Sequence, residues 1–517
     1  MRFFNTAGPC RPEIHYTVDP LPRLPEVRRL IDGQHYFVIH APRRTGKTTF
    51  LYALMHALNR EGRYTALQVN IQPAASGRDP DQAMLIAAEC VHSQARRLLP
   101  AAERPASLDG VDGEEFARGG LKGYLQRWAE RNPKPIVLLV DEADSLMDEL
   151  FLALLRQLRA GFEARPQGFP HALALVGLRD VRDYQIRLRP DSSRLGTGSP
   201  FNIKTESLFM DGFTAAEVNA LLDQHTVETG QMFPPEVRAE IWRLSQGQPW
   251  LTNALANQIV ANVLDNDTRQ VITLDHVLAA REQLIQRRDT HLDSLADKLR
   301  EPMVKPIAMA IINGEDLEGD RLNDDLAYAQ DLGLVTRESP IRFANPIYQE
   351  IIPRVLNQGF QLSFNQDLVD PVWYIKAGRL DLVALLRAFQ KFYRRYSEAW
   401  LEKYDFREVG RQLLLMAFLQ RILNGGGRIE REMAVGNGRC DLWIEFGGEQ
   451  FVIELKLNRD QWSESDGLEQ TARYLSRLGL DHGYLLLFEL DSRKPWEERL
   501  RWEARECAGK RVTLVGM

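Results

Sequence analysis

The 517-residue sequence predicts a multidomain α/β protein whose N-terminal domain is built on a parallel β-sheet. Apolar, strand-like runs at 36–40, 64–71, 135–140 and 172–177 alternate with helical patterns. Such alternation is typical of β-α-β units, so we expect residues 1–205 to form one parallel α/β domain. With roughly 100 to 200 residues per domain, the rest of the chain has room for two or three more domains.

The first strand-like run leads directly into a loop whose composition suits phosphate binding. The loop consists of Ala41, Pro42, Arg43, Arg44, Thr45, Gly46, Lys47, Thr48 and Thr49. Backbone N–H groups in such a loop surround the β-phosphate, Lys47 adds positive charge, and the Thr48 hydroxyl is a ligand for Mg²⁺. Ala41 stands where the usual pattern has its first glycine. We expect these nine residues to bind ATP together with Mg²⁺.

An acidic pair follows the third strand-like run. The apolar residues 135–140 read as a central parallel strand and end in Asp141-Glu142. Asp141 is expected to hold the Mg²⁺ shell, and Glu142 to orient and deprotonate the attacking water. The alternative is an acidic turn without a catalytic role. Arg179 and Arg182, after the fourth run, could sense the γ-phosphate or lie on the surface, and the sequence leaves both open.

A helical region follows the sheet domain. Thr214 and Glu217 suggest a capping box, and helical patterns continue to about residue 265. The first half of the chain resembles AAA-like ATPases of the STAND and archaeal-ATPase clade, through Lys47, Thr48, Asp141, Glu142 and the element Gly247-Gln248-Pro249. The resemblance implies a helical lid over 206–268 with Pro249 against the nucleotide. It also implies a switch or an oligomerising motor, so we expect a homo-oligomer.

Residues 269–360 suggest a winged-helix-like domain. Helices are expected at 305–312 and 322–331, and a wing hairpin at 334–337 with 341–343. The second helix would present Asp324, Asp325 and Asp331, which a phosphate backbone would repel. We therefore expect this domain to be structural or to bind a protein partner rather than to read DNA. Residues 361–399 are expected to form a helical linker.

A β-hairpin near the C-terminus carries three charged residues on one face. If Gly448-Glu449 forms the turn, Asp441 lies opposite Lys456 with Glu454 on the diagonal, within roughly 5 to 8 Å. Alternation places the apolar residues of both strands on the other face. Asp441 and Glu454 would then hold a hard cation, Mg²⁺ or Mn²⁺, while Lys456 stabilises developing negative charge. The alternative is a solvated face of an ordinary hairpin.

Two flanking features strengthen the metal hypothesis. Glu408 lies on the inward stripe of the preceding helix and is a third candidate ligand. Gln470 and Tyr474 lie one turn apart on the following helix. Residues 400–517 thus resemble the PD-(D/E)XK nuclease superfamily, with Cys440 in place of the usual proline. The resemblance implies a restriction-endonuclease-like α/β fold in which Asp441, Glu454, Lys456 and Gln470 are catalytic and Glu408 is a weaker match.

Together the two resemblances imply a nucleotide-regulated, metal-dependent nuclease acting on nucleic acid, with DNA the expected substrate, in defence or mobile-element handling. Bacterial ATPase proteins that carry such a C-terminal nuclease are similar in plan. Two alternatives stay open. One is an ATP-switch scaffold or transcriptional regulator with an inert nuclease fold, and the other is a DNA-remodelling motor in which this fold only grips.

Composition sets limits on partners and location. Lys and Arg number 65 against 71 Asp and Glu, so any nucleic-acid site must be a local basic surface. Cys10, Cys90, Cys440 and Cys507 contain no CxxC pair, which argues against a zinc ribbon or a disulfide framework. No apolar run approaches the roughly 18 residues of a membrane span, and the N-terminus lacks a signal-peptide pattern. A cytoplasmic protein without membrane contact is expected.

Overall fold

The computed structural model describes residues 2–108, 113–146, 148–178, 204–287, 298–299, 301–312, 317, 324–356, 374–376, 378–403, 415, 419, 428–435, 438–458, 463–489 and 494–517. The chain divides into two compact units. The first comprises Met1–Asp293 with Glu318–Ile347, and the second Ser294–Leu317 with Tyr348–Met517. No helix within the described ranges is both long and apolar enough to cross a membrane.

The first unit contains a five-stranded parallel sheet in the order β4-β5-β6-β3-β7. Its strands are β3 (Tyr36–His40), β4 (Thr65–Asn70), β5 (Ile136–Asp141), β6 (Ala172–Gly177) and β7 (Lys204–Phe209). The parallel sheet predicted from the four apolar runs is confirmed, and β7 adds a fifth strand. All residues of β3, β5 and β6 are buried, as continuous apolar runs require in a sheet covered on both faces.

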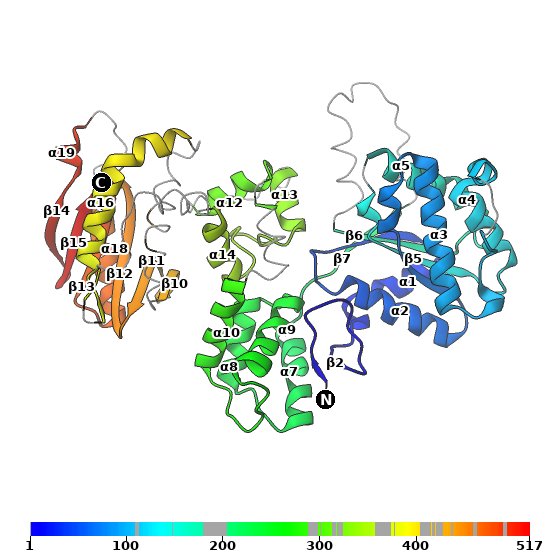
Figure 1. The fold of residues 1–517 in the computed structure, drawn as a ribbon, viewed down its shortest axis with the longest axis horizontal. Helices are drawn as coiled ribbons and strands as arrows, with labels where there is room; N and C mark the ends of the chain where they lie inside the picture. Colours follow the sequence, from blue (N-terminus) through cyan, green and yellow to red (C-terminus); the bar gives the residue numbers. More distant parts are fainter. Residues whose placement is uncertain are drawn as a thin grey trace. The chain divides into compact units, whose positions relative to one another are not determined.

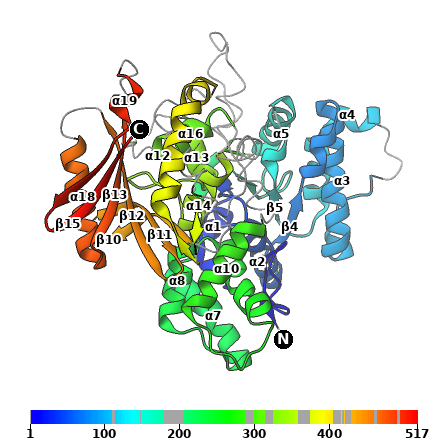
Figure 2. The same cartoon turned by 60° about the vertical axis from the view of Figure 1, so that its left-hand side comes forward.

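Helices cover both faces of this sheet (Figure 1). One face packs on α1 (Glu26–Asp32) and α2 (Lys47–Glu61). The other packs on α3 (Pro80–Leu98), α4 (Gly113–Arg131) and α5 (Asp148–Gly161). Figure 2 shows α3 and α4 side by side. Short helical turns complete the connections: η1 (Leu21–Arg23), η2 (Gln72–Ser76), η3 (Ala101–Glu103), η4 (Ala143–Ser145) and η5 (Phe162–Ala164).

A helical subdomain follows β7. It contains α7 (Ala215–Thr229), α8 (Pro235–Ser245), α9 (Pro249–Asn257), the π-helical turn η6 (Gln258–Val263) and α10 (Leu274–Arg287). Thr214 and Glu217 form the expected capping box at the start of α7. Because α10 packs against α8, α9 and η6, the subdomain extends past the predicted limit at residue 268. The paired strands β1 (Phe3–Phe4) and β2 (His15–Tyr16) pack their aromatic rings against it.

The region predicted as a winged helix is shared between the two units. The helix α13 (Asp324–Asp331) and an isolated bridge between Val335 and Phe343 belong to the first unit. The helix α12 (Val304–Ile312) belongs to the second, and α14 (Pro346–Leu356) begins at the boundary. Asp331 does not face outward as predicted. It is 6% exposed and paired with Arg337 at 2.6 Å, so the repulsion argument does not apply to it.

The second unit contains a six-stranded mixed sheet in the order β10-β11-β12-β13-β15-β14 (Figure 1). Its strands are β10 (Arg428–Val435), β11 (Gly438–Phe446), β12 (Glu449–Asn458), β13 (His482–Glu489), β14 (Trp502–Cys507) and β15 (Lys510–Gly516). Residues of α16 (Leu382–Lys403) and α18 (Ser463–Leu478) pack on opposite faces. The small elements are β8 (Ile375–Lys376), β9 (Arg379–Leu380) and α19 (Trp496–Arg499).

The β11–β12 hairpin differs from the predicted register by two residues. Phe446 pairs with Glu449, so the turn is Gly447-Gly448 rather than Gly448-Glu449. Both turn glycines have positive φ, 57° and 80°, and a two-residue hairpin turn of this kind strongly favours glycine at both positions. Because the shift is an even number, every side chain keeps its predicted face. Asp441 therefore lies opposite Glu454 instead of Lys456.

The packing of α16 makes a prediction about domain limits. The sequence places residues up to 399 in a linker, but Leu385, Leu386 and Phe389 are buried in the core of the second unit. Loss of these three side chains removes roughly 5 to 9 kcal/mol of apolar burial, comparable to the stability of a whole domain. We expect a fragment 374–517 to unfold cooperatively on heating and a fragment 400–517 to show no cooperative transition. Equal transitions in both fragments would show that α16 is dispensable.

Candidate nucleotide site and candidate metal centre

The loop between β3 and α2 has the backbone of a phosphate cradle. Gly46 precedes Lys47, the first residue of α2, and has a φ of 96°, while Arg44 is also left-handed at 61°. Ala41 is not among the residues with positive φ, and its methyl group is fully buried in the core beneath α2. The first position of this loop therefore accommodates a side chain without strain. Gly46 does require the conformational freedom of glycine.

The Lys47 ammonium lies inside the loop. Its Nζ donates to the carbonyl oxygens of Ala41 at 2.7 Å and Pro42 at 3.0 Å. Burial lowers the pKa of Lys47, opposed by the nearby charges of Asp144, Glu142 and Asp141. An ammonium held among carboxylates at a helix N-terminus is well placed to pair with phosphate oxygens.

The end of β5 brings two carboxylates to this loop. The Thr48 hydroxyl donates to Asp141 Oδ2 at 2.8 Å, which places two hard oxygen ligands together as Mg²⁺ requires. Burial raises the pKa of Asp141, although the Thr48 hydrogen bond opposes the shift. Glu142 is left-handed, with a φ of 54°. Burial, then the charges of Asp144 and Asp141, raise the pKa of Glu142, which makes it a better proton acceptor.

The structure adds Asp144, which the sequence reasoning missed. Asp144 Oδ2 accepts a hydrogen bond of 2.7 Å from the backbone N–H of Leu178 and thereby ties the ends of β5 and β6 together. A Cβ at Gly177 would approach the Asp144 carboxyl carbon to 2.8 Å, so a larger residue at position 177 would displace the Asp144 side chain. The signal was available, because Asp144 follows the acidic pair by two residues. Arg179 and Arg182, by contrast, lie outside the described residues.

Arg23 connects the phosphate loop with the helical subdomain. Its guanidinium donates to the Thr45 carbonyl at 3.3 Å and to the Asp211 carbonyl, and lies 4.0 Å from the Glu217 carboxylate. Burial lowers the pKa of Arg23, opposed by Glu217 and Asp211. No motif in the sequence marks this residue, since its partners lie far away along the chain.

A second connection joins the loop, the helical subdomain and the N-terminal arm. The Arg44 guanidinium lies 4.8 Å from the centre of the Trp250 ring, and Trp250 Nε1 donates to the Thr6 carbonyl at 2.8 Å. The backbone N–H of Cys10 donates to the Thr49 hydroxyl at 3.0 Å. Pro249 is the first residue of α9, directly before Trp250, and its contact with nucleotide stays a prediction.

Residues 324–347, here called the backing segment, pack behind the phosphate loop. Gly333, with a φ of 71°, lies so close to Pro42 that a Cβ there would approach the proline ring to 2.7 Å. Asp331 Oδ1 is 3.9 Å from His40 Nδ1, at the end of β3. The Arg337 guanidinium carbon lies 3.7 Å from the centre of the Phe209 ring of β7. The backing segment thus contacts β3, which leads into the loop, and the neighbouring strand β7.

In the second unit the hairpin brings Asp441, Glu454 and Lys456 together. Glu454 is completely buried. Its Oε1 lies 3.5 Å from the Lys456 ammonium and accepts no hydrogen bond from the described residues. Its Oε2 lies 3.4 Å from the Asp441 N–H, and Asp441 Oδ2 accepts 2.7 Å from the Leu455 N–H. Burial and the Asp441 charge raise the pKa of Glu454 to about 8, and Lys456 offsets only part of this.

A hard dication fits this arrangement. Two neighbouring carboxylates, one of them fully buried, carry two negative charges that the single Lys456 ammonium offsets only in part, and a dication would supply the remaining positive charge. Within the described ranges no three His, Cys, Asp or Glu side chains gather as a metal cluster. Glu408, the third predicted ligand, lies outside those ranges. Among the described residues, Asp441 and Glu454 are therefore the two carboxylates that could hold a cation here.

The helix α18 covers the same face of the sheet. Gln470 Nε2 donates to the Tyr474 hydroxyl at 2.9 Å, and Tyr474 is buried with Trp443 and Val452. A Cβ at Gly467 would approach Lys456 Cγ to 3.1 Å, so the first turns of α18 lie over Lys456. The structure thus places Gln470 on the helix above the charged trio.

Comparison with known proteins identifies a family match within the first unit. The sequence family described as AAA domain matches residues 29–185. No curated protein matches the sequence. Among solved structures, the chain is similar to a Walker-type ATPase of Pyrococcus abyssi, with 13% identity, a TM-score of 0.48, and 68% of this chain and 99% of that chain covered. It is also similar to the RuvB Holliday junction branch migration motor of Thermotoga maritima, with 16% identity and a TM-score of 0.33. That match covers 64% of this chain and 92% of the RuvB chain.

The loop geometry predicts distinct effects for two substitutions. Lys47→Ala removes the ammonium that would bind phosphate oxygens, so nucleotide affinity should fall about 100-fold or more. Glu142→Gln keeps the side-chain shape but not the base, so binding should persist while turnover falls roughly 10²- to 10⁴-fold. Calorimetry and phosphate release measure the two effects, with the exposed Glu163→Gln as a control. Turnover at the parent rate in Glu142→Gln would show that another group is the base.

The raised pKa of Glu454 predicts a pH-dependent stability. Native Glu454 keeps its proton up to about pH 8, whereas the unfolded chain releases it near 4.5, so the native state binds more protons in this window. The free energy of unfolding should therefore fall as pH rises from 4.5 to 8, and the melting temperature should drop by roughly 2 to 4 °C per kcal/mol lost. Thermal scans of the full chain with EDTA test this. Mn²⁺ should restore stability at pH 8, and Glu454→Gln should lose this part of the pH dependence.

Proposed function

Because residues 29–185 form a P-loop ATPase domain of the AAA type, we propose that the protein is an ATP-regulated, metal-dependent nuclease acting on DNA. One observation carries the nuclease part. Glu454 is a fully buried carboxylate directly beside Asp441 and Lys456, with one oxygen atom that accepts no hydrogen bond from the described residues. Such a carboxylate is costly for the fold, and a site that binds a cation gives it a role.

The three residues support phosphodiester cleavage by complementary roles. Asp441 and Glu454 would hold Mg²⁺ or Mn²⁺, which when bound activates water and neutralises phosphate charge. The Lys456 ammonium, 3.5 Å from Glu454 and about one-third exposed, is positioned to stabilise the negative charge that develops on the phosphate. Gln470 on α18 would orient the attacking water or the phosphate. Hairpin, lysine and covering helix together support a PD-(D/E)XK, restriction-endonuclease-like domain.

The backing segment supports control by nucleotide. Lys47 donates to the Pro42 carbonyl, and Pro42 lies directly against Gly333. When the ammonium turns to phosphate oxygens, Pro42 loses this hydrogen bond, and the backing segment senses the change through contact. The chain then continues from this segment into α14 and the second unit. Nucleotide binding would thus alter the segment that leads to the nuclease domain.

Cleavage assays separate this function from a scaffold with an inert fold. Plasmid and single-stranded DNA are incubated with Mg²⁺ or Mn²⁺, with and without ATP. We expect the parent to cut only with metal, and ATP to change the rate. Asp441→Asn and Glu454→Gln should lose both cleavage and Mn²⁺ binding by calorimetry. Lys456→Met should keep Mn²⁺ binding but cut about 10²- to 10³-fold more slowly.

The matched control is Glu445→Gln, on the same strand and face as Asp441 but about 14 Å further along it. This variant should cut like the parent. If the parent cuts neither DNA substrate under any metal and nucleotide condition, the nuclease proposal is wrong and the two alternatives without cleavage remain. Cleavage by Asp441→Asn at the parent rate would place the active site elsewhere. Cleavage by the Glu142→Gln variant, which should bind ATP without hydrolysing it, shows whether ATP binding alone is sufficient to change the cleavage rate.

A further inference from the structure

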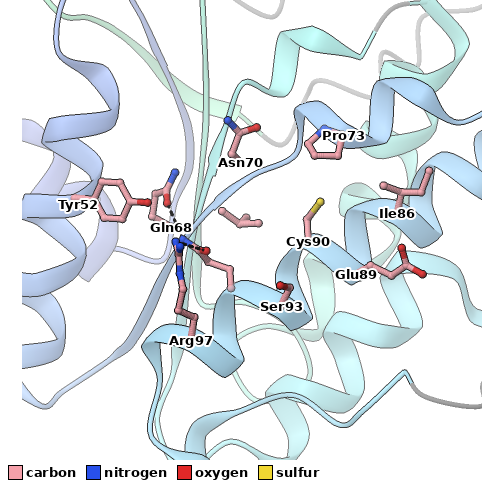
Figure 3. A pocket seen from close by; sticks show the side chains of 11 residues that line it. Tyr52, Gln68, Asn70, Pro73, Ile86, Glu89, Cys90, Ser93 and Arg97 are labelled. Carbon is pink, nitrogen blue, oxygen red and sulfur yellow. Dashed lines mark hydrogen bonds between the residues drawn. The ribbon is translucent and has the colours of Figure 1, made fainter. Parts of the chain in front are cut away.

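A polar pocket opens beside the nucleotide site, between α2, β4 and α3 (Figure 3). Its volume is about 420 Å³, within the range of roughly 300 to 1,000 Å³ typical of small-molecule sites. Gln68, which is 2% exposed, lines its inner wall, while Asn70, Ser93 and Arg97 lie on its exposed side. None of the phosphate-loop residues lines the pocket. The pocket is therefore separate from the nucleotide site.

A chain of hydrogen bonds leads from this pocket to the Mg²⁺ ligands. Arg97 Nη2 donates to Gln94 Oε1 at 2.8 Å, and Gln94 Nε2 donates to Gln68 Oε1 at 3.2 Å. Gln68 Nε2 then donates to Asp141 Oδ2 at 3.4 Å. The same Asp141 oxygen accepts the Thr48 hydroxyl. Each amide in this chain accepts from one neighbour and donates to the next, so the hydrogen bonds run in one direction from Arg97 to Asp141.

We propose that this pocket binds a small, amide-containing molecule with a single carboxylate, and that its occupant weakens Mg²⁺ binding at Asp141. A carboxylate is a stronger acceptor for a guanidinium than a neutral amide oxygen. It would therefore take the Arg97 donor away from Gln94. Gln94 would then hold Gln68 less firmly, and Asp141 would lose a hydrogen bond that orients its carboxylate, a loss that typically weakens metal binding. The Asn70 and Ser93 side chains offer partners for the amide group of the ligand.

The charge pattern of the pocket sets the class of ligand. Glu89 lies two helical turns from Arg97, about 12 Å along α3, and disfavours a second negative group. A dianion or a phosphate ester is thus a poor fit, whereas one carboxylate at the Arg97 end is favourable. The proposal rests on the nucleotide site of the first unit and is independent of DNA cleavage.

Cys90 lines the pocket and permits a test with a tethered charge. In a full-length chain with Cys10, Cys440 and Cys507 changed to serine, 2-carboxyethyl methanethiosulfonate is reacted with Cys90. The thiolate attacks the reagent's sulfenyl sulfur, a mixed disulfide forms, and methanesulfinate leaves. Burial raises the pKa of the Cys90 thiol, so the reaction is run at alkaline pH and followed by mass spectrometry. The matched reagent carries a trimethylammonium group.

The readout is nucleotide affinity with and without Mg²⁺, measured by calorimetry. The carboxylate adduct should weaken the Mg²⁺-dependent part of binding roughly two- to tenfold, and the ammonium adduct should not. Gln94→Ala alone should weaken it to a similar extent, whereas Arg96→Ala, an exposed position on the same helix but outside the pocket, should not. In Arg97→Ala the two adducts should behave alike.

Two results would overturn the proposal. One is equal nucleotide affinity of the two adducts in the protein that keeps Arg97, and the other is a lower affinity of the carboxylate adduct that persists in Arg97→Ala. Either result would leave the nuclease assignment intact, because DNA cleavage is not measured. A parent protein that binds no nucleotide at all would instead remove the nucleotide site, and with it both proposals.

Discussion

A carboxylate withdrawn from water must be compensated by hydrogen bonds, by a cation or by a proton, and both units contain one on a buried strand. In the first unit, Asp141 ends β5 and receives the Thr48 hydroxyl and the Glu142 N–H. In the second, Glu454 lies within β12 beside Asp441 and Lys456. The groups around each carboxylate decide how its charge is compensated.

The two carboxylates differ in what surrounds them. Asp141 belongs to a network that includes Lys47, Gln68 and Thr48, so neutral hydrogen-bond donors and a cation together stabilise its negative charge. Glu454 is buried beside the negative charge of Asp441, and the Lys456 ammonium at 3.5 Å offsets only part of their effect, so Glu454 shifts toward its neutral form instead. A dication would reverse this shift, because it favours the charged form of both carboxylates. If the second site binds the proposed cation, ion binding and proton release would thus be linked there.

The sequence was sufficient to predict features that depend on local patterns. Continuous apolar runs located four strands of the parallel sheet, and alternation along β11 and β12 assigned each side chain to its face. The predicted hairpin register was wrong because both Gly447-Gly448 and Gly448-Glu449 contain glycine and could form the turn. The positive φ angles of Gly447 and Gly448 show that these two residues form it. Because the register shift was even, Asp441, Glu454 and Lys456 still lie on one face of the hairpin, although Asp441 lies opposite Glu454 and not Lys456.

Contacts between distant segments could not be predicted in the same way. Arg23, Trp250 and Gly333 meet the phosphate loop through folds that bring residues together from opposite ends of the first unit. A single sequence contains no periodicity or motif that predicts such tertiary contacts. The same holds for α16, whose amphipathic pattern suits a linker helix as well as a core helix. Tertiary packing, not local preference, decides these cases.

Ala41 has a consequence for how related chains are recognised. The first residue of this phosphate loop lies in the core with ordinary backbone angles, so a methyl group is accepted there, whereas Gly46 is left-handed at a φ of 96°. The two glycines of the usual pattern are therefore not equivalent in physical terms. A motif search that insists on glycine at both positions will overlook working loops of this type, and one that relaxes only the first position will recover them.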